Sequence, residues 1–307
     1  MGVPQNCPLC GSGIQTQFPI SRFVWGGQPT QAVYRCEECD IAYVNPRMTE
    51  EQHKSFYEKE FENFMDKRGG PTGYWHDPEK HIQRNEPECQ RRLKALKEFL
   101  PEKPGRILEI GSSSGFMLFP LIEMGFDVVS IEPSLMFSEY IRSRGVTCFN
   151  WTDDLLESEE LGDGFDLILH YGVLEHVNDP QQFIKQQLGI LLPEGKIILE
   201  APCVDDALIT VYDIPELENF YWVLAHYWYF SAKSLENLVS KLDCSYEIRL
   251  DQRYDLSNHL AWVQNRKPGG AGSFTEILGS EIEAQYKQAL IRAGHSDTVV
   301  AILNKEK

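Results

Sequence analysis

Two pairs of cysteines near the start of the chain have the spacing of a metal site. Cys7 and Cys10 form one Cys-x-x-Cys knuckle, and Cys36 and Cys39 form a second one. Two such knuckles supply the four thiolates of a tetrahedral zinc site. Because four thiolates leave no open coordination position, we expect a structural Zn²⁺. The alternative is two redox-active pairs, which would need a thioredoxin-like βαβ context that the flanking residues lack.

A second candidate site is a loop of small residues, EIGSSSG, which runs from Glu109 to Gly115 after an apolar run. Glu132 ends the next apolar run, where an acidic residue binds ribose hydroxyls in dinucleotide sites. The dinucleotide loop is GxGxxG, but here Ser113 takes the middle position and Phe116 the third. We therefore expect a ligand with a ribose and no pyrophosphate. For the loop alone, a tight turn that binds nothing is the alternative.

Three histidines are placed where they could act near such a ligand, and histidine suits proton removal near neutral pH. His176, in the segment LEHVNDP, is a candidate general base, with a structural or substrate-positioning role as the alternative. His226, in an aromatic segment, is a second candidate, either as base or as substrate ligand. His170 lies within a predicted strand, where we expect a buried, hydrogen-bonded side chain.

Alternating strands and helices must position these residues. From Arg106 onward the pattern predicts an α/β fold, with a Rossmann-like, mostly parallel seven-stranded sheet and helices on both faces. The last two strands are expected to pair antiparallel. Before the sheet, two amphipathic helices are expected, with Thr49 as a possible N-cap of the first. The expected strands are residues 106–110, 127–132, 147–151, 165–172, 196–202, 247–255 and 297–305, and the two early helices are residues 48–65 and 89–100.

These motifs resemble a known family. The segments EIGSSSG, IEPS, FDLI with VLEHVNDP, and GKIILE are similar to the motif series of class I S-adenosylmethionine-dependent methyltransferases. The segments CPLCG, CEEC, YVNPRMT and HYWYFSAKSL resemble a zinc-ribbon subgroup associated with methylation of sugars, polysaccharides and other small molecules. The resemblance implies a zinc ribbon at residues 1–48, a helical connector at 49–100, and a methyltransferase domain at 101–307 with an aromatic lid near 205–230.

The resemblance also implies a cofactor site. The loop would face the amino-acid part of S-adenosylmethionine, and Glu132 would bind the ribose. Residues after the third strand of the sheet would border the adenine, where Asp153 is the nearest match to the usual acidic residue. Residues at the end of the fourth strand would lie near the sulfonium. The implied cofactor-binding residues are Glu109, Gly111, Ser112, Ser113, Gly115, Glu132, Trp151, Thr152, His170 and Tyr171.

Aromatic residues are concentrated in the expected lid. They either pack as a lid on the sheet or form a surface that stacks on a sugar or another ring. A second wall of the site is expected from RYDLSNHLAW, with Tyr254, Asn258, His259 and Trp262. The lid aromatics are Phe220, Tyr221, Trp222, Tyr227, Trp228, Tyr229 and Phe230.

Composition limits the partners. The formal net charge of −17 and the absence of a long Lys/Arg run argue against nucleic acid, which needs a basic surface. No apolar stretch approaches the about 20 residues of a membrane helix, and the isolated cysteines and lack of a secretion signal suit the cytoplasm.

We expect methyl transfer to a hydroxyl of a small molecule, most plausibly a carbohydrate or nucleotide-linked sugar. The alternatives are an RNA- or protein-modifying methyltransferase that uses the ribbon for recognition, and a non-catalytic cofactor-fold binding protein. The oligomeric state is not predicted.

Overall fold

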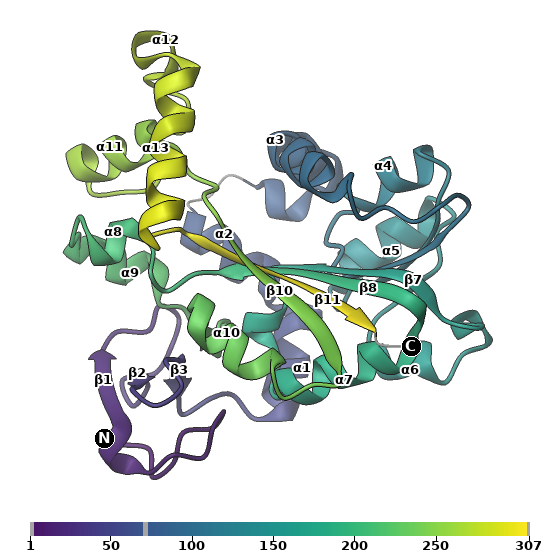
Figure 1. The fold of residues 1–307 in the computed structure, drawn as a ribbon, viewed down its shortest axis with the longest axis horizontal. Coiled ribbons are helices and arrows are strands. Elements are labelled where there is room, and N and C mark those ends of the chain that lie inside the picture. The colour runs from purple at the N-terminus through teal and green to yellow at the C-terminus, as the bar shows by residue number, and fades with distance from the viewer. Residues whose placement is uncertain (1–2, 70–72, 306–307) are drawn as a thin grey trace.

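A central sheet of seven strands organises the computed structural model, which describes residues 3–69 and 73–305 (Figure 1). The strands are β4 (Arg106–Ile110), β5 (Asp127–Ile131), β6 (Cys148–Phe149), β7 (Phe165–Tyr171), β8 (Leu191–Pro202), β10 (Cys244–Asp251) and β11 (Thr298–Lys305). Their order across the sheet is β10-β11-β8-β7-β4-β5-β6. β11 runs antiparallel to β8 and β10, and the other neighbours are parallel. The predicted fold class is therefore confirmed.

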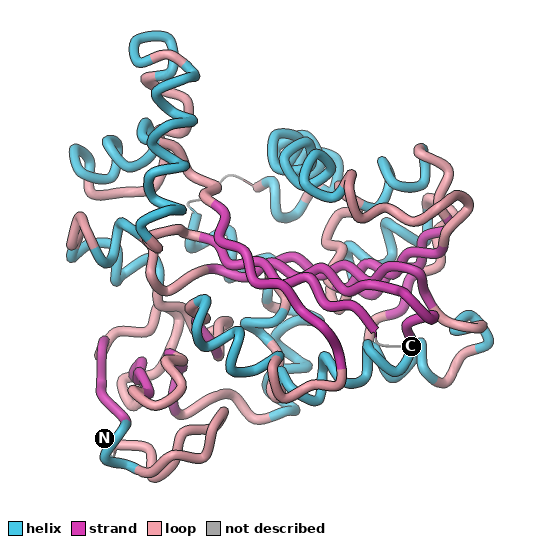
Figure 2. The backbone as a smooth tube through the Cα atoms, in the orientation of Figure 1, coloured by secondary structure: helices cyan, strands magenta, loops and turns pink. Residues whose placement is uncertain are grey.

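Helices cover both faces of this sheet, as Figures 1 and 2 show. Successive strand residues point to opposite faces, so Leu167 and Leu169 pack in one apolar cluster and Ile168 in another. Burial on both faces explains why the central strands read as continuous apolar runs. One face carries α3 (Pro78–Leu96), α4 (Leu118–Glu123) and α5 (Leu135–Ser143), and the other carries α7 (Pro180–Ile190) and α10 (Ala232–Val239).

A second sheet is built around the N-terminal residues, and one of its strands comes from far along the chain. Its strands are β1 (Gln17–Ser21), β2 (Ala32–Cys36), β3 (Ala42–Asn45) and β9 (Trp228–Tyr229), in that order. β9 pairs antiparallel with β3 and belongs to the aromatic segment. A short bridge also joins Trp25 to Val223. The N-terminal residues and the aromatic segment therefore share one sheet.

The segment between the two sheets is helical, with different boundaries from those predicted. The first expected helix is divided at Glu60 into α1 (Glu50–Lys59) and α2 (Phe61–Gly69). Thr49 caps α1 as predicted, in a capping box with Gln52. α3 begins well before the expected residue 89, because Asp77 caps it and Pro78 occupies its first position. Its first half has few apolar residues, so the hydrophobic pattern there is weak.

The remaining helices connect the strands. Between β10 and β11 the chain makes a long helical excursion, which projects from the molecule in Figure 1. No helix in the two described ranges combines the length and the apolar character needed to cross a membrane. The remaining α-helices are α6 (Thr152–Leu156), α8 (Ala207–Thr210), α9 (Glu218–Tyr221), α11 (Leu256–Asn265), α12 (Thr275–Leu278) and α13 (Ser280–Ala293). The 3₁₀ turns are η1 (Ile14–Thr16), η2 (Tyr74–His76), η3 (Glu159–Leu161), η4 (Leu174–His176) and η5 (Pro215–Leu217).

Candidate functional site

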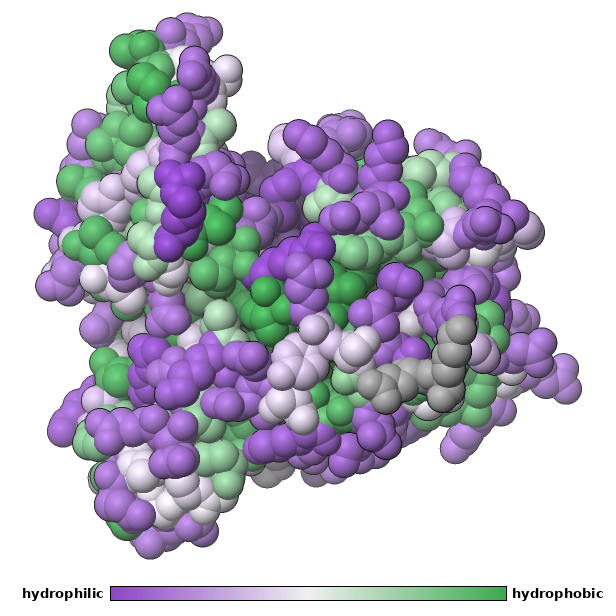
Figure 3. Space-filling model, in the orientation of Figure 1, coloured by the Kyte–Doolittle hydropathy of each residue, from purple (hydrophilic) through white to green (hydrophobic). Residues whose placement is uncertain are grey.

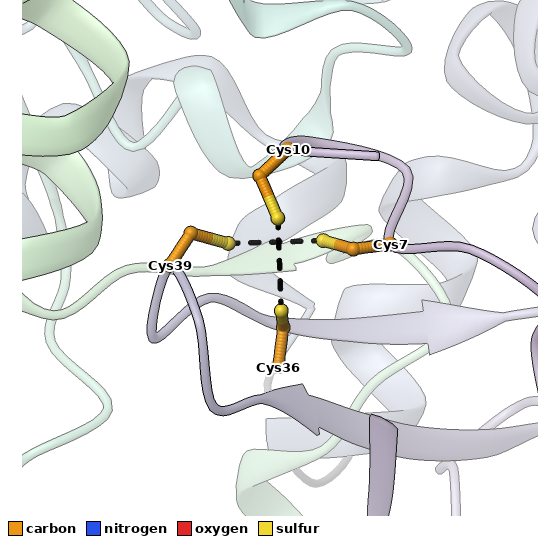
Figure 4. Close-up of side chains that lie close together, drawn as sticks. All are labelled: Cys7, Cys10, Cys36 and Cys39. Carbon is orange, nitrogen blue, oxygen red and sulfur yellow. Dashed lines mark hydrogen bonds between the residues drawn. The ribbon is translucent and has the colours of Figure 1, made fainter. Parts of the chain in front are cut away.

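The four predicted metal ligands converge on one point (Figure 4). The Sγ atoms of Cys7 and Cys39 are 3.7 Å apart, as are those of Cys10 and Cys36. All four sulfur atoms lie within 4.8 Å of one another. In each knuckle the backbone turns back on itself, through Gly11 N–H to the Cys7 carbonyl at 2.9 Å, and through the equivalent bond of the second knuckle.

The loop after β4 has the backbone geometry of a close-approach site. Gly111, Ser113 and Gly115 all have φ in the left-handed region, at 73°, 51° and 83°. A Cβ on Gly111 would lie 2.5 Å from Cγ2 of Val173, so only glycine fits there. Ser113 has a Cβ, so its left-handed backbone conformation is strained.

Glu132 holds this loop against the loop that follows β5. Its Oε2 accepts a hydrogen bond from the Ser113 N–H at 2.6 Å, and its Oε1 accepts one from the Ser134 N–H at 2.8 Å. The side chain is 7% exposed, and burial raises its pKa to about 7. Each carboxylate oxygen can accept further hydrogen bonds, so the group still has capacity for hydroxyl donors.

Glu109 lies in β4 itself and faces α3. It is 4% exposed, its Oε2 has no hydrogen-bond partner among the described residues, and burial raises its pKa to about 8. The Arg92 guanidinium partly opposes that rise in pKa. A buried carboxyl oxygen without a partner is costly, and its presence beside the loop marks a place where a donor is missing.

The other implied cofactor residues are spread over three places. Ser112 is buried in the loop, with its Oγ 2.5 Å from Oγ of Ser130. Trp151 precedes α6, and its indole N–H donates to Glu58 of α1 at 3.3 Å. Thr152 opens α6, and Asp153 after it is exposed.

His170 and Tyr171 end β7 and point to opposite faces of the sheet. The Tyr171 ring lies under the Arg92 guanidinium, 4.5 Å away, on the α3 face. His170 lies against Phe183 of α7, with ring centroids 5.3 Å apart. It is fully buried as predicted, but the predicted hydrogen bond is absent, since neither ring nitrogen has a partner among the described residues. The apolar packing explains this, and burial lowers the pKa of His170 to about 3.

His176 lies in η4, just beyond the end of β7, and its ring is held on one side. Nδ1 is 2.8 Å from the Ala225 carbonyl oxygen, which can only accept, so Nδ1 carries the ring proton. The Tyr57 hydroxyl lies 2.6 Å from the same nitrogen and donates to the same carbonyl at 3.3 Å. Burial lowers the pKa of His176 to about 4, so the ring is neutral near pH 7. Its Nε2 then holds the free lone pair.

His226 lies edge-to-face against His176, with ring centroids 4.8 Å apart. Burial lowers the pKa of His226 well below its usual value, so it too is neutral. Glu175 adjoins the pair, with Oε1 3.8 Å from His176 Nε2, and burial raises its pKa to about 8. These three side chains offer ligand atoms within 4.8 Å of one another, a spacing that would suit a metal ion. However, the Arg68 charge lowers the pKa of both histidines and therefore disfavours a cation there.

The aromatic segment covers this histidine pair and is fastened on two sides. Tyr227 N–H donates to the Glu175 carbonyl at 2.7 Å, and the Trp228 indole donates to the Val177 carbonyl at 2.7 Å. On the other side, β9 pairs with β3. Most of the aromatic side chains are buried, so they are packing contacts rather than an open stacking surface. Phe220 and Tyr221 remain partly exposed.

The residues of the expected second wall contribute mainly to packing among the helices between β10 and β11. Asn258 and His259 are buried in α11, and His259 Nδ1 lies 2.6 Å from the Tyr286 hydroxyl of α13. Of the four residues, Trp262 reaches the aromatic segment, with its ring 5.7 Å from that of Phe220.

Sequence reasoning missed the contribution of the early helices. His53 and Tyr57 of α1 contact His176. Nε2 of His53 lies 3.0 Å from the backbone carbonyl oxygen of His176, and the Tyr57 hydroxyl contacts the His176 ring. Glu62 of α2 hydrogen-bonds Ser134, next to the Glu132 loop. His81 of α3 is 2.8 Å from the Ser114 hydroxyl in the glycine loop. The four-residue spacing of His53 and Tyr57 places both on one helix face, which was the available signal.

Fold and site together define a Rossmann-like methyltransferase fold. A match to the methyltransferase-domain family extends over residues 79–247, more than half of the chain. The protein therefore belongs to the methyltransferase-domain family.

Similar proteins agree with this assignment at the level of the fold. A SAM-dependent methyltransferase structure from Thermotoga maritima superposes with a TM-score of 0.50 at 23% identity, covering 80% of this chain and 98% of that one. One from Archaeoglobus fulgidus gives 0.50 at 13% identity, covering 80% and 100%. Among curated relatives, a tRNA U34 carboxymethyltransferase of Syntrophotalea carbinolica is 30% identical over 169 residues, 52% of this chain and 49% of that one. A ubiquinone biosynthesis O-methyltransferase of Rhizobium etli is 29% identical over 115 residues, 36% and 46%. The chain thus spans about half of each curated relative or less.

Proposed function

We propose that this protein transfers the methyl group of S-adenosylmethionine to a hydroxyl of a small molecule, a carbohydrate or nucleotide-linked sugar. The observation that carries the proposal is the His176–His226 pair. Two neutral imidazoles lie together, that of His176 just beyond the end of β7 and that of His226 in the aromatic segment. Neutral imidazole is the form that accepts a proton, as methylation of a hydroxyl requires.

The residues around the glycine loop fit S-adenosylmethionine. Glu109 has an unpaired buried oxygen, for which a ligand ammonium would be the missing donor. Glu132 is anchored by two backbone N–H groups and keeps lone pairs for the ribose hydroxyls. Gly111 leaves room for close approach of a ligand. When bound, S-adenosylmethionine supplies a methyl group made electrophilic by its sulfonium.

Within this site we assign distinct roles to the two histidines. The Ala225 carbonyl and the Tyr57 hydroxyl fix the His176 ring with Nε2 as its free lone pair. His176 is therefore the general base. His226, which lies edge-to-face against it, orients the acceptor hydroxyl toward that lone pair. The buried aromatic segment excludes water from the pair.

The four cysteines fit a structural zinc ion. A tetrahedral ion with Zn–S bonds of about 2.3 Å places sulfurs about 3.8 Å apart, close to the 3.7 Å seen for both pairs. The Ser12 hydroxyl lies 3.1 Å from the sulfurs of Cys10 and Cys36, where it can donate to thiolates. We propose that zinc holds the module at residues 1–48 and thereby the aromatic segment paired with it.

The acceptor is best tested directly. Purified protein with S-adenosylmethionine would be offered nucleotide sugars, lipid-linked sugars, small phenols and a tRNA transcript, and mass spectrometry would look for the gain of one CH₂. Product on a sugar is expected. The curated relatives are named for tRNA and ubiquinone chemistry, so the tRNA and phenol arms are the informative alternatives. Product on tRNA alone would overturn the sugar proposal, and failure to bind S-adenosylhomocysteine would favour a non-catalytic binding protein.

The histidine roles have their own test. Replacing His176 by Asn should lower kcat by about 100-fold or more, in keeping with general-base catalysis, while leaving S-adenosylhomocysteine affinity nearly unchanged. Replacing His226 by Asn should raise KM for the acceptor as well as lower kcat. Equal loss of cofactor affinity in either variant would assign that histidine a structural role.

A further inference from the structure

Arg68, in the last turn of α2, lies against the aromatic segment next to the histidine pair. Its guanidinium carbon is 4.2 Å from the centroid of the Phe220 ring. Its Nε and one terminal nitrogen both donate to the Phe220 carbonyl, at 3.1 and 3.0 Å. The side chain therefore reaches from the connector to the partly exposed end of the aromatic segment.

The charge of Arg68 differs from that of other buried arginines in what surrounds it. Among the described residues, no carboxylate lies within ion-pair distance of the Arg68 guanidinium. Arg91, by contrast, pairs with three carboxylates, those of Glu88, Glu200 and Asp251. The contrast matters in a chain with 46 acidic and 29 basic residues. A partly buried charge left unpaired is unfavourable unless a ligand completes it.

Arg68 also keeps hydrogen-bond donors in reserve. The Phe220 carbonyl uses Nε and one terminal nitrogen. The other terminal nitrogen, Nη1, makes no hydrogen bond within the described part of the chain and is not one of its fully buried polar atoms. Its N–H groups are therefore the free edge of the guanidinium. A guanidinium offers its N–H groups in one plane, a geometry suited to the paired oxygens of a phosphate or carboxylate.

The free edge lies on the acceptor side of the site. From Phe220 the segment leads directly to Tyr221, whose ring centroid is 5.4 Å from that of Tyr229, which is 5.4 Å from that of His226. After burial, the Arg68 charge is among the causes that lower the pKa of both His176 and His226. An anion at Arg68 would thus be held near the proposed reacting groups.

We propose that Arg68 binds an anionic group, a phosphate or a carboxylate, of the methyl acceptor. The inference rests on the proposed function and narrows it, because a neutral sugar or phenol would leave the guanidinium unpaired. Sites built to pair with a charged group reject analogues that lack it. Arg68 is then a specificity-determining residue for the acceptor.

Binding measurements on the full chain test this. Protein saturated with S-adenosylhomocysteine would be titrated with glucose 1-phosphate, uridine diphosphate glucose and 4-hydroxybenzoate, and with glucose and phenol as neutral counterparts. The first two probes report a phosphate acceptor and the third a carboxylate. We expect an anionic probe to bind at least about tenfold more tightly than its neutral counterpart, as a charge-assisted hydrogen bond implies. In Arg68→Gln that preference should disappear.

Lys67→Gln is the matched control, because Lys67 is an exposed cation on the same turn and its replacement changes the net charge equally. It should keep the preference for anionic probes. Arg68→Lys should fold and retain part of it, which covers the case in which Arg68→Gln does not fold. Equal binding of anionic and neutral probes by the wild-type protein would overturn the inference, as would loss of the preference in Lys67→Gln. Failure of S-adenosylhomocysteine itself to bind would instead refute the proposed function.

Discussion

The two sides of the proposed site, one for the cofactor and one for the acceptor, are built in different ways. On the cofactor side, Glu109, the glycine loop and Glu132 lie on neighbouring parallel strands and their following loops, within one short stretch of chain. On the acceptor side, His176 is surrounded by residues from α1, α2 and the aromatic segment, which are far apart in sequence. The first arrangement follows from strand geometry alone. The acceptor-side arrangement depends on tertiary contacts, among them the pairing of β9 with β3 of the N-terminal sheet.

The difference suggests that the two sides can be damaged independently. The cofactor side depends on the main sheet. The apolar cluster on its α3 face contains no residue of the cysteine module, whereas on the other face Cys7 and Cys36 share a cluster with Leu108 of β4. The acceptor side depends on the module, the connector and the aromatic segment together. Cofactor affinity and acceptor turnover can therefore serve as internal controls for each other.

The largest effect is expected from removing the metal ligands. Replacing Cys36 by Ser should release the module and, through β3 and β9, the aromatic segment, lowering kcat/KM for the acceptor by about 100-fold or more. S-Adenosylhomocysteine affinity, measured by calorimetry, should change by less than about threefold. Cys244, which is not one of the four metal-site cysteines, provides a cysteine-to-serine control. An equal fall in kcat/KM for the acceptor and in S-adenosylhomocysteine affinity would show that the two sides are not separable.

The next effect should be confined to the cofactor side. Replacing Glu132 by Gln leaves one of the two N–H donors, Ser113 or Ser134, without an acceptor. Loss of a hydrogen bond to a charged group costs about 1.5–3 kcal/mol, so S-adenosylhomocysteine affinity should fall by roughly tenfold to 100-fold. Acceptor KM at saturating cofactor should stay the same. A change in acceptor KM with cofactor affinity intact would contradict the assignment.

A pH dependence follows from the buried carboxyl groups. Burial raises the pKa of Glu109 to about 8 and that of Glu132 to about 7. Both ionise as the pH rises through that window, and the ionised forms are those that accept an ammonium and ribose hydroxyls. Cofactor affinity should therefore increase from about pH 6 to about pH 8.5, by at most about tenfold per unit for each proton released. Calorimetry across that range, in buffers of different ionisation enthalpy, would also count the protons.

The stability of the ligand-free protein should change in the opposite direction. A carboxyl whose pKa is raised by folding binds more protons in the folded than in the unfolded state. Its contribution to stability is complete below the unfolded pKa, about 4.5, and is lost as the pH rises through about 7 to 8. The melting temperature of the ligand-free protein should therefore fall as the pH rises across this window. A rise would show that these carboxylates are stabilised by partners in the folded protein.

The smallest effect should come from Tyr57. Replacing it by Phe removes one of the two groups at Nδ1 of His176 but leaves the Ala225 carbonyl. One hydrogen bond contributes about 1 kcal/mol, so kcat should fall about fivefold with no change in cofactor affinity. Because Tyr57 is a positioning residue, the pH profile of kcat should shift as well. An unchanged profile with lower thermal stability would indicate packing alone.

The sequence predicts the cofactor side better than the acceptor side, because the first is formed by local patterns and the second by contacts between distant segments. The glycine loop, the position of Glu132 and the βα alternation are local patterns, and the mostly parallel seven-stranded sheet was predicted from them. The capped start of α1 at Thr49 was local too. β9 has two residues and pairs with a strand far away, so no periodicity could identify it. Arg68 and Glu175 gained their significance only from tertiary contacts.

Two of the differences are instructive. His170 was expected to form a hydrogen bond, but its strand position faces the apolar side of α7, where Phe183 packs on it. The start of α3 was missed because its first turns are polar, although Asp77 and Pro78 form a capped start that the sequence displays. The neighbouring helix determined the outcome for His170, whereas the start of α3 is set by the local sequence.

The central claim is that a cofactor site formed by the sheet is separate from an acceptor site around His176 and His226. It is tested most directly by calorimetric titration of S-adenosylhomocysteine into the wild-type protein and a variant with both histidines replaced by Asn. We expect binding to both proteins, with affinities equal within about threefold. Absence of binding to the wild-type protein, or loss of binding in the double variant, would contradict it.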